Sequence, residues 1–139
     1  MKLAKGFRKA QEVSLLSDKP KRIKVGAAIY YKKRLIAIGY SSSRDSYLQR
    51  IYNIKYRNGR TYTSNGVHAE MMALENLLKN DPHRKLNRKK LSIYIYRELC
   101  DGSLALAKPC KACSKALKHA GITKIYYTGY KSLIEETVI

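Results

Sequence analysis

The chain has 139 residues, of which 29 are Lys or Arg and 10 are Asp or Glu, so its formal net charge at pH 7 is +19. This length suits one domain with a hydrophobic core, and the 45% hydrophobic content excludes a disordered chain. We see no apolar run that could cross a bilayer and no signal peptide, so we expect an intracellular protein without a membrane partner. Two of the three cysteines lie in a metal-type motif, which leaves no disulfide framework.

The excess of positive charge predicts a polyanionic partner. Such an excess destabilises a compact chain by self-repulsion unless polyanions or salt relieve it. Nucleic acid is the polyanion that we expect, as substrate or as ligand. A merely solubilising surface is the alternative, because net charge alone does not specify a ligand.

The first forty residues predict a helix followed by two strands. Apolar residues along one face predict an amphipathic helix over residues 2–16. Residues 24–31 are largely apolar and predict a buried strand, and the dipeptide Lys32-Lys33 makes a turn into a returning strand over residues 34–40. We therefore expect a β-hairpin after the first helix.

A polar segment rich in tyrosine and arginine follows, over about residues 41–65. Alternation over residues 52–56 and the dipeptide Asn58-Gly59, which favours a type I′ turn, predict a small exposed hairpin. A polar segment of this length in a compact domain usually has a function or is disordered. We interpret it as a basic, tyrosine-rich insertion in the domain.

The remainder of the chain alternates between helices and strands. Apolar spacing predicts helices over residues 66–80 and 109–120, and β-type runs predict strands over 91–96 and 124–128. Residues 133–139 can form a last strand, which must run antiparallel to the one before it because too few residues remain for a crossover helix. The order predicts a three-layer α/β/α sandwich with a mixed sheet of roughly five strands, in a single domain over residues 1–139.

Two short motifs supply the ligands of a catalytic zinc. Residues 68–70 lie near the start of one helix, and Cys110 and Cys113 lie three residues apart on the first turn of the other. The imidazole of His68 and two thiolates leave an open coordination position for water, as catalytic zinc sites do. Glu70 is offset around its helix from His68, so we predict that it is the general acid and base rather than a ligand. We therefore expect one Zn²⁺ per chain.

Other interpretations of these motifs are open. A C-x-x-C pair alone also occurs in structural zinc knuckles and redox pairs, and a lone histidine is often a core residue. Cys100 as a fourth ligand would close the site and leave Glu70 without a role. We instead place Cys100 at a strand end as a buried free thiol.

Residues 67–74, 108–113 and 121–127 resemble the cytidine deaminase superfamily, and the resemblance runs from residue 25 to residue 128. It implies zinc on His68, Cys110 and Cys113, a proton shuttle at Glu70, and hydrolytic deamination of a nucleobase. It also implies a helix-covered sheet with the two metal-bearing helices side by side. A homo-oligomer is compatible with this resemblance.

The resemblance leaves the subfamily open. Histidine as the first ligand is similar to deoxycytidylate, tRNA-adenosine and polynucleotide deaminases, whereas an antiparallel last strand is similar to nucleoside enzymes and certain bacterial and phage deaminases. Many members carry a sugar-contacting asparagine just after the second strand, and residues 39–42 of this chain contain none. The candidate substrate contacts are therefore Ser41, Ser42, Asn53, Ala69, Lys108 and Pro109.

The basic, tyrosine-rich character of the chain favours a polynucleotide substrate. Aromatic side chains stack on bases and cations contact phosphates. The candidate nucleic-acid contacts are Arg44, Tyr47, Arg50, Tyr52, Tyr56, Arg57, Arg60, Lys111 and Lys115. In the alternative, the tyrosines pack as a small satellite core and the lysines are solvated.

Together these observations predict a zinc-dependent hydrolytic deaminase that converts cytosine to uracil in single-stranded or flipped-out nucleic acid. The enzymatic alternatives are a free-nucleotide or nucleoside cytidine deaminase and a tRNA adenosine deaminase. The non-enzymatic alternative is a zinc-stabilised nucleic-acid-binding module. Glu70 argues against that module, because binding alone needs no proton shuttle.

Overall fold

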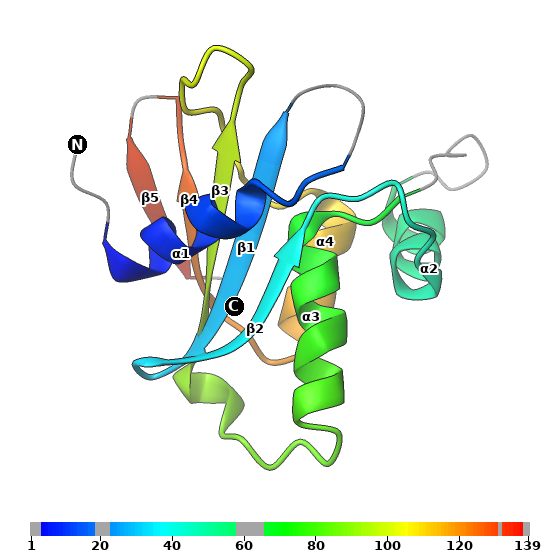
Figure 1. Cartoon of the computed structure of the whole chain (residues 1–139). Helices are drawn as coiled ribbons and strands as arrows, with labels where there is room; N and C mark the ends of the chain where they lie inside the picture. The colour runs from blue at the N-terminus through cyan, green and yellow to red at the C-terminus, as the bar shows by residue number, and fades with distance from the viewer. Residues whose placement is uncertain (1–3, 19–22, 58–65, 131, 138–139) are drawn as a thin grey trace.

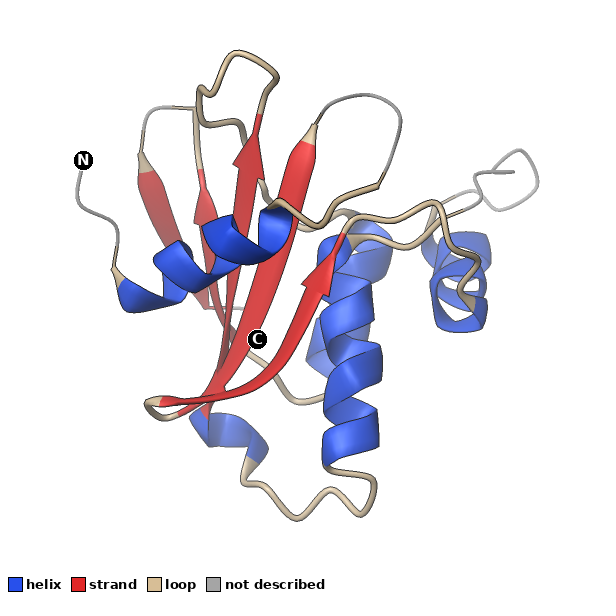
Figure 2. Ribbon diagram, in the orientation of Figure 1, coloured by secondary structure: helices blue, strands red, loops and turns tan. Residues whose placement is uncertain are grey.

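The computed structural model describes residues 4–18, 23–57, 66–130 and 132–137. Its sheet has the strand order β2-β1-β3-β4-β5, with helices on both faces (Figure 1). The mixed α/β architecture predicted from the sequence is confirmed. The elements, which Figure 2 shows by type, are α1 (Lys5–Ser14), β1 (Lys24–Tyr31), β2 (Arg34–Tyr40), α2 (Tyr47–Tyr56), α3 (Ala69–Asn80), the 3-10 helix η1 (Arg88–Lys90), β3 (Leu91–Glu98), α4 (Lys111–His119), β4 (Lys124–Thr128) and β5 (Leu133–Thr137).

The sheet is mixed because one of its strand pairs is parallel. β1 pairs antiparallel with both β2 and β3, whereas β3 and β4 run parallel. Helix α4 lies in the connection between β3 and β4, as the crossover of a parallel pair requires. β5 then returns antiparallel to β4, with Leu133 opposite Thr128, which confirms the predicted direction of the last strand.

The two faces of the sheet carry different helices, and the register of β1 and β2 shows which. Gly26 lies opposite Tyr40 and Ala27 opposite Gly39, so Gly26 and Gly39 face opposite sides of the sheet. A Cβ on Gly26 would collide with the backbone of α1, and a Cβ on Gly39 with the backbone of α3. Each helix therefore packs directly on a strand backbone, α1 on one face and α3 on the other.

The larger hydrophobic core lies on the α3 side of the sheet. Ile93 and Ile95 of β3 are fully buried there, together with Met71 of α3 and Leu117 of α4. The residue between the two isoleucines, Tyr94, points to the other face, where its ring contacts Phe7 of α1 edge-on and stacks on Tyr126. The sheet thus separates an aliphatic core under α3 and α4 from an aromatic one under α1.

Both metal-motif helices begin later than predicted. His68 has extended backbone dihedrals and is the N-cap residue of α3, which starts at Ala69 rather than at residue 66. Cys110 is the N-cap residue of α4, which starts at Lys111 rather than at residue 109. The first ligand of each motif therefore comes immediately before its helix, at the N-cap position, and not within the helix.

The described part of the predicted hairpin is a helix. α2 spans Tyr47–Tyr56, and the hydroxyl of its N-cap residue Ser46 accepts a hydrogen bond from the backbone N–H of Gln49. The hairpin prediction is wrong because this cap, together with residues four apart that meet on one helix face, outweighs a short period-two pattern. The predicted Asn58-Gly59 turn lies outside the described residues.

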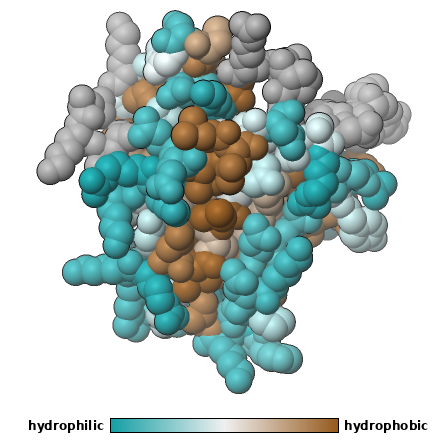
Figure 3. Space-filling view, in the orientation of Figure 1, coloured by the Kyte–Doolittle hydropathy of each residue, from teal (hydrophilic) through white to brown (hydrophobic). Residues whose placement is uncertain are grey.

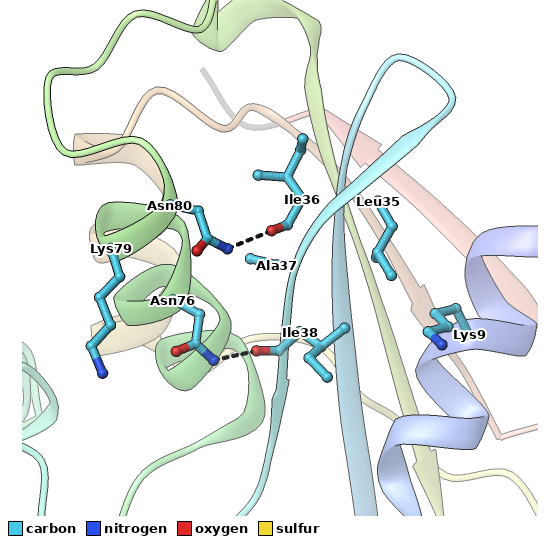
Figure 4. A pocket seen from close by; sticks show the side chains of 8 residues that line it. All are labelled: Lys9, Leu35, Ile36, Ala37, Ile38, Asn76, Lys79 and Asn80. Carbon is cyan, nitrogen blue, oxygen red and sulfur yellow. Dashed lines mark hydrogen bonds between the residues drawn. The ribbon is translucent and has the colours of Figure 1, made fainter.

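Helix α3 caps the free edge of β2. Nδ2 of Asn76 donates a hydrogen bond to the carbonyl of Ile38, and Nδ2 of Asn80 to that of Ile36, both over 2.7 Å (Figure 4). Side-chain donors on edge carbonyls hinder pairing with a further strand. A pocket lies at this edge, and none of its lining residues is a candidate site residue.

A hydrophobic band runs down the middle of the face that carries α1 and β2, between hydrophilic side chains (Figure 3). Among the exposed apolar side chains are those of Leu15 and Leu16, which follow α1, and of Leu35 in β2.

None of the helices in the described ranges combines the length and the apolar character needed to cross a membrane.

Candidate metal and catalytic site

Three side chains from two helix starts converge on one point. Nδ1 of His68 lies 3.3 Å from Sγ of Cys113 and 3.6 Å from Sγ of Cys110, and the three atoms lie within 4.8 Å of one another. In a tetrahedral site with Zn–N of about 2.0 Å and Zn–S of about 2.3 Å, an N–S edge is about 3.5 Å long. The donor types and their spacing therefore fit one Zn²⁺.

The local structure of α4 brings the two sulfurs together. The side chain of Cys110 accepts a hydrogen bond from the backbone N–H of Cys113 (Sγ···N 3.4 Å), which closes the first turn of the helix. Both cysteines thus lie at the positive end of the helix dipole, which stabilises thiolates. His68 approaches them because α3 and α4 pack in the same core.

The two thiols differ in their pKa values. A hydrogen bond from the side chain of Cys113 lowers the pKa of Cys110 to about 3, and His68 adds to this effect. Burial raises the pKa of Cys113. Cys110 is therefore the more acidic of the two thiols. A metal ion takes sulfur ligands as thiolates, so its binding releases any proton that a thiol still carries.

Glu70 lies beside the three ligand atoms. Its Oε1 is 3.9 Å from Nδ1 of His68, and only 6% of the residue is exposed. Burial raises the pKa of the Glu70 carboxyl, and the neighbouring His68 offsets part of this rise. A carboxyl with a raised pKa is suited to taking up and releasing a proton at neutral pH.

Cys100 is exposed, so the prediction of a buried thiol is wrong. After β3 the chain forms a closed loop, in which the backbone N–H of Gly102 donates to the carbonyl of Leu99 and that of Leu99 to the carbonyl of Ser103. This loop carries Cys100 away from the core. Cys100 does not belong to the cluster of ligand atoms that the described residues form, so the closed four-ligand alternative has no geometric support.

Helix α2 packs against α4 next to the metal ligands. Gln49, which sequence reasoning did not single out, accepts a hydrogen bond from the backbone N–H of His68 over 2.9 Å. Gln49 and Asn53, four residues apart, are the buried residues of this helix. That polar pair becomes a recognisable signal only once the segment is known to be a helix.

The two serines predicted as substrate contacts are buried and bonded within the chain. The hydroxyl of Ser41 donates to the hydroxyl of Ser17, and that of Ser42 donates to the carboxylate of Asp18. These bonds connect the segment after α1 with the end of β2. A contact of either serine with substrate stays a prediction.

The other predicted substrate contacts lie closer to the metal ligands. Asn53 is buried and accepts a hydrogen bond from the side chain of Gln49. Ala69 is buried between His68 and Glu70 in sequence, whereas Lys108 is exposed just before α4. Pro109, partly buried, precedes the first cysteine ligand.

The tyrosines of α2 divide between two environments. Tyr52 and Tyr56 stack on each other, and Oη of Tyr52 lies 2.9 Å from Nδ1 of His119 on α4. This is the satellite packing that the sequence left as an alternative. Tyr47, by contrast, is 72% exposed at the start of α2.

The basic candidates near α2 are half-exposed and paired. Arg44 forms an ion pair with Glu75 over 3.0 Å, and Arg50 with Asp45 over 3.2 Å. Nη1 of Arg57 lies 3.9 Å from Sγ of Cys110, so this cation reaches the metal ligands. Among the other candidates, Lys111 is exposed, Lys115 lies over the ring of Tyr56, and Arg60 is outside the described residues.

A family model for the cytidine and deoxycytidylate deaminase zinc-binding region matches residues 1–129. The chain belongs to this family. It is accordingly a zinc-dependent deaminase of the cytidine type, and Zn²⁺ is its cofactor. No curated protein matches the chain by sequence.

Solved structures of this fold include two deaminases from different sources. The dCMP deaminase of cyanophage S-TIM5 in apo form is 22% identical, with 89% of this chain and 79% of that chain covered and a TM-score of 0.58. Its complex with dCMP and dUMP is 20% identical, with coverages of 87% and 76% and a TM-score of 0.54. The cytidine deaminase of Burkholderia pseudomallei is 15% identical, with coverages of 95% and 89% and a TM-score of 0.59. Likeness at these identities concerns the fold.

Proposed function

We propose that this deaminase converts cytosine to uracil, with His68, Cys110 and Cys113 holding Zn²⁺ and Glu70 carrying protons. The observation that carries the proposal is the buried carboxyl of Glu70 beside the three ligand atoms, 3.9 Å from Nδ1 of His68. When bound, Zn²⁺ supplies a Lewis acid that makes water a nucleophile near neutral pH.

Glu70 then carries two protons in turn. It takes a proton from the water that adds to C4 of the base and delivers this proton to the ring nitrogen N3. It next takes the remaining proton from the hydroxyl group that was added to C4 and passes it to the amino group. The C4–N bond then breaks, C4 becomes a carbonyl carbon, and ammonia leaves. One water is consumed, and the products are uracil and ammonia. The raised pKa of the buried carboxyl supports this role, because a permanently ionised carboxylate is a poor proton donor.

The proposed substrate is cytosine in single-stranded or flipped-out nucleic acid. A formal charge of +19 is far more than a single phosphate requires. Helix α2, which packs beside the metal ligands, also carries an exposed aromatic and cationic pair, with Cζ of Arg50 5.8 Å from the ring centroid of Tyr47. Such pairs stack on bases and contact phosphates without sequence preference.

A free nucleotide such as deoxycytidylate is the second candidate. The family includes deoxycytidylate deaminases, and the fold is shared with a phage dCMP deaminase. In this case Arg57, whose guanidinium lies 3.9 Å from a ligand sulfur, suffices for one 5′-phosphate. The remaining positive charge then has no part in substrate binding.

A substrate panel tests both candidates. Ammonia release is measured from cytidine, deoxycytidylate, tRNA and a single-stranded oligonucleotide containing cytosine. We expect uracil in the oligonucleotide and activity that falls steeply as salt rises. Turnover of deoxycytidylate without turnover of the oligonucleotide would replace the polynucleotide proposal by the second candidate. Turnover of adenosine in tRNA alone would overturn the assignment of cytosine.

The variant Glu70→Gln tests the chemistry separately from folding. It keeps the size of the side chain but removes its proton-carrying group, so we expect activity to fall by about 10²–10⁴-fold. Zinc content, measured by elemental analysis, stays at one ion per chain. Undiminished activity in this variant would exclude Glu70 as the proton carrier.

Self-association of the protein into a homo-oligomer also stays a prediction. Size-exclusion chromatography with light scattering measures the mass of the particle and checks it.

A further inference from the structure

The carboxamide of Gln49 lies between the two helix starts that carry the proposed ligands. Gln49 is only 1% exposed. Its Oε1 accepts a hydrogen bond from the backbone N–H of His68 over 2.9 Å. Sγ of Cys113 lies 3.9 Å from its Nε2 and 4.0 Å from its Oε1. One buried side chain from α2 therefore contacts two of the three ligand residues, one on α3 and one on α4.

The orientation of this carboxamide follows from its partners. The backbone N–H of His68 can only donate, so the atom of Gln49 that faces it is the carbonyl oxygen. The amino group consequently faces the other way, where it donates to Oδ1 of Asn53 over 3.0 Å. A sulfur that binds a metal as a thiolate has no proton to donate to Oε1, so its hydrogen bond with Gln49 is the one from the amino group. An N–H donor favours negative charge on a sulfur.

We infer that Gln49 is a positioning residue of the metal site, which holds His68 at the start of α3 and donates to the sulfur of Cys113. Asn53, one turn later on α2, fixes the orientation of the Gln49 carboxamide. The inference rests on the ligand set of the proposed function. It gives the buried polar face of α2 a role as a support of the metal ligands, beside the exposed face with its candidate substrate contacts.

Removing such a support weakens metal binding. Partners that orient metal ligands are typically worth about 10–100-fold in metal affinity. Gln49→Met keeps a side chain of similar length but removes both hydrogen bonds, so we expect zinc binding to weaken by about 10–100-fold. Asn53→Ala leaves Gln49 in place and frees its carboxamide to rotate, so we expect a smaller loss of the same kind.

Asn76→Ala is the matched control. It removes another side-chain amide hydrogen bond, which runs from α3 to the carbonyl of Ile38 and not to any of the three ligand residues. We expect its zinc affinity to equal that of the wild-type protein. A general loosening of the fold would weaken zinc binding in the control as well as in Gln49→Met.

The experiment is a competition for Zn²⁺ with a chromophoric chelator, together with absorption spectra of the Co²⁺-loaded proteins. The thiolate-to-cobalt band reports on the sulfurs, so loss of the N–H donor shifts it in Gln49→Met and not in Asn76→Ala. Zinc affinity of Gln49→Met within about twofold of the wild-type value would overturn the inference. If Gln49→Met does not fold, unchanged affinity and spectrum in Asn53→Ala overturn it instead. Wild-type affinity in Cys113→Ser would overturn the ligand set itself, so the two failures are distinguishable.

Discussion

Replacing Gly39 by alanine tests whether the close packing of α3 on β2 positions the metal site. A Cβ at Gly39 would collide with the carbonyl oxygen of Ala69 and the backbone nitrogen of Ala73, and would lie 3.0 Å from Cα of Ala73. These are backbone atoms, so no change of side-chain rotamer relieves the collision. Carbon atoms in contact lie about 3.5–4.0 Å apart, and the first turn of α3 must therefore withdraw by roughly 1 Å.

This withdrawal affects both stability and activity. Overpacking a core contact lowers the free energy of unfolding by about 1–3 kcal/mol. Because the obstacle is backbone, we expect Gly39→Ala to lie at the upper end of this range. Ala69 lies between His68 and Glu70 in the chain, so the same shift moves a proposed ligand and the proposed proton carrier. A misplacement of about 1 Å costs on the order of 10²-fold in rate.

Gly26→Ala is the control on the opposite face. Its Cβ would collide with the carbonyl oxygen of Ala10 and lie 2.9 Å from Cα of Ser14, both in α1. We expect a comparable loss of stability in urea unfolding of the zinc-free protein. Zinc affinity and ammonia release per folded molecule should stay near the wild-type values. Gly39→Ala as stable as the wild type, or an equal loss of zinc affinity in both variants, would refute the reasoning.

Three further predictions concern stability. Zinc should raise the free energy of unfolding by about 2.7 kcal/mol at a free concentration of 100 times its Kd, seen as a rise in Tm, and Cys113→Ser should lack this rise. Burial raises the pKa of Asp81, but hydrogen bonds from backbone N–H groups in the turn after α3 outweigh it and lower the pKa. The stability from this carboxylate is therefore present above the unfolded pKa of about 4 and is lost as pH falls through the lower folded pKa. Asp81→Asn should accordingly lose less stability on acidification than the wild type in urea titrations below about pH 4, and an unchanged acid limb would contradict this. Asn76→Ala should cost about 1 kcal/mol, because a hydrogen bond to the carbonyl of Ile38 is lost. It should also increase concentration-dependent light scattering, because the edge of β2 is freed.

The strands and the proposed ligands were predictable because their signals are local. Ile93 and Ile95 alternate with Tyr94, and this period of two follows from the geometry of any strand. Cys110 and Cys113 are three residues apart and therefore meet on one helical turn. The direction of the last strand also followed from the sequence, since the chain after β4 is too short for a crossover.

The surroundings of the metal ligands depended on contacts between distant segments. Whether Tyr52 stacks on a base or packs in the protein was open in the sequence, and only the packing of α2 on α4 placed it against His119. Gln49 contacts residues 19 and 64 positions further along the chain, so no local sequence pattern predicts its place beside the proposed ligands. The sequence predicted Cys100 as a buried thiol at the end of a strand, but the residue lies in the loop after β3 and is exposed.

The sequence by itself thus determined the proposed chemistry of the site, because His68, Cys110 and Cys113 supply the donor types of a catalytic zinc and Glu70 supplies a carboxyl group beside them. Only the tertiary structure decided which side chains support that site. Supporting contacts depend on how α2, α3 and α4 pack together, and this packing is a property of the whole core rather than of any short segment.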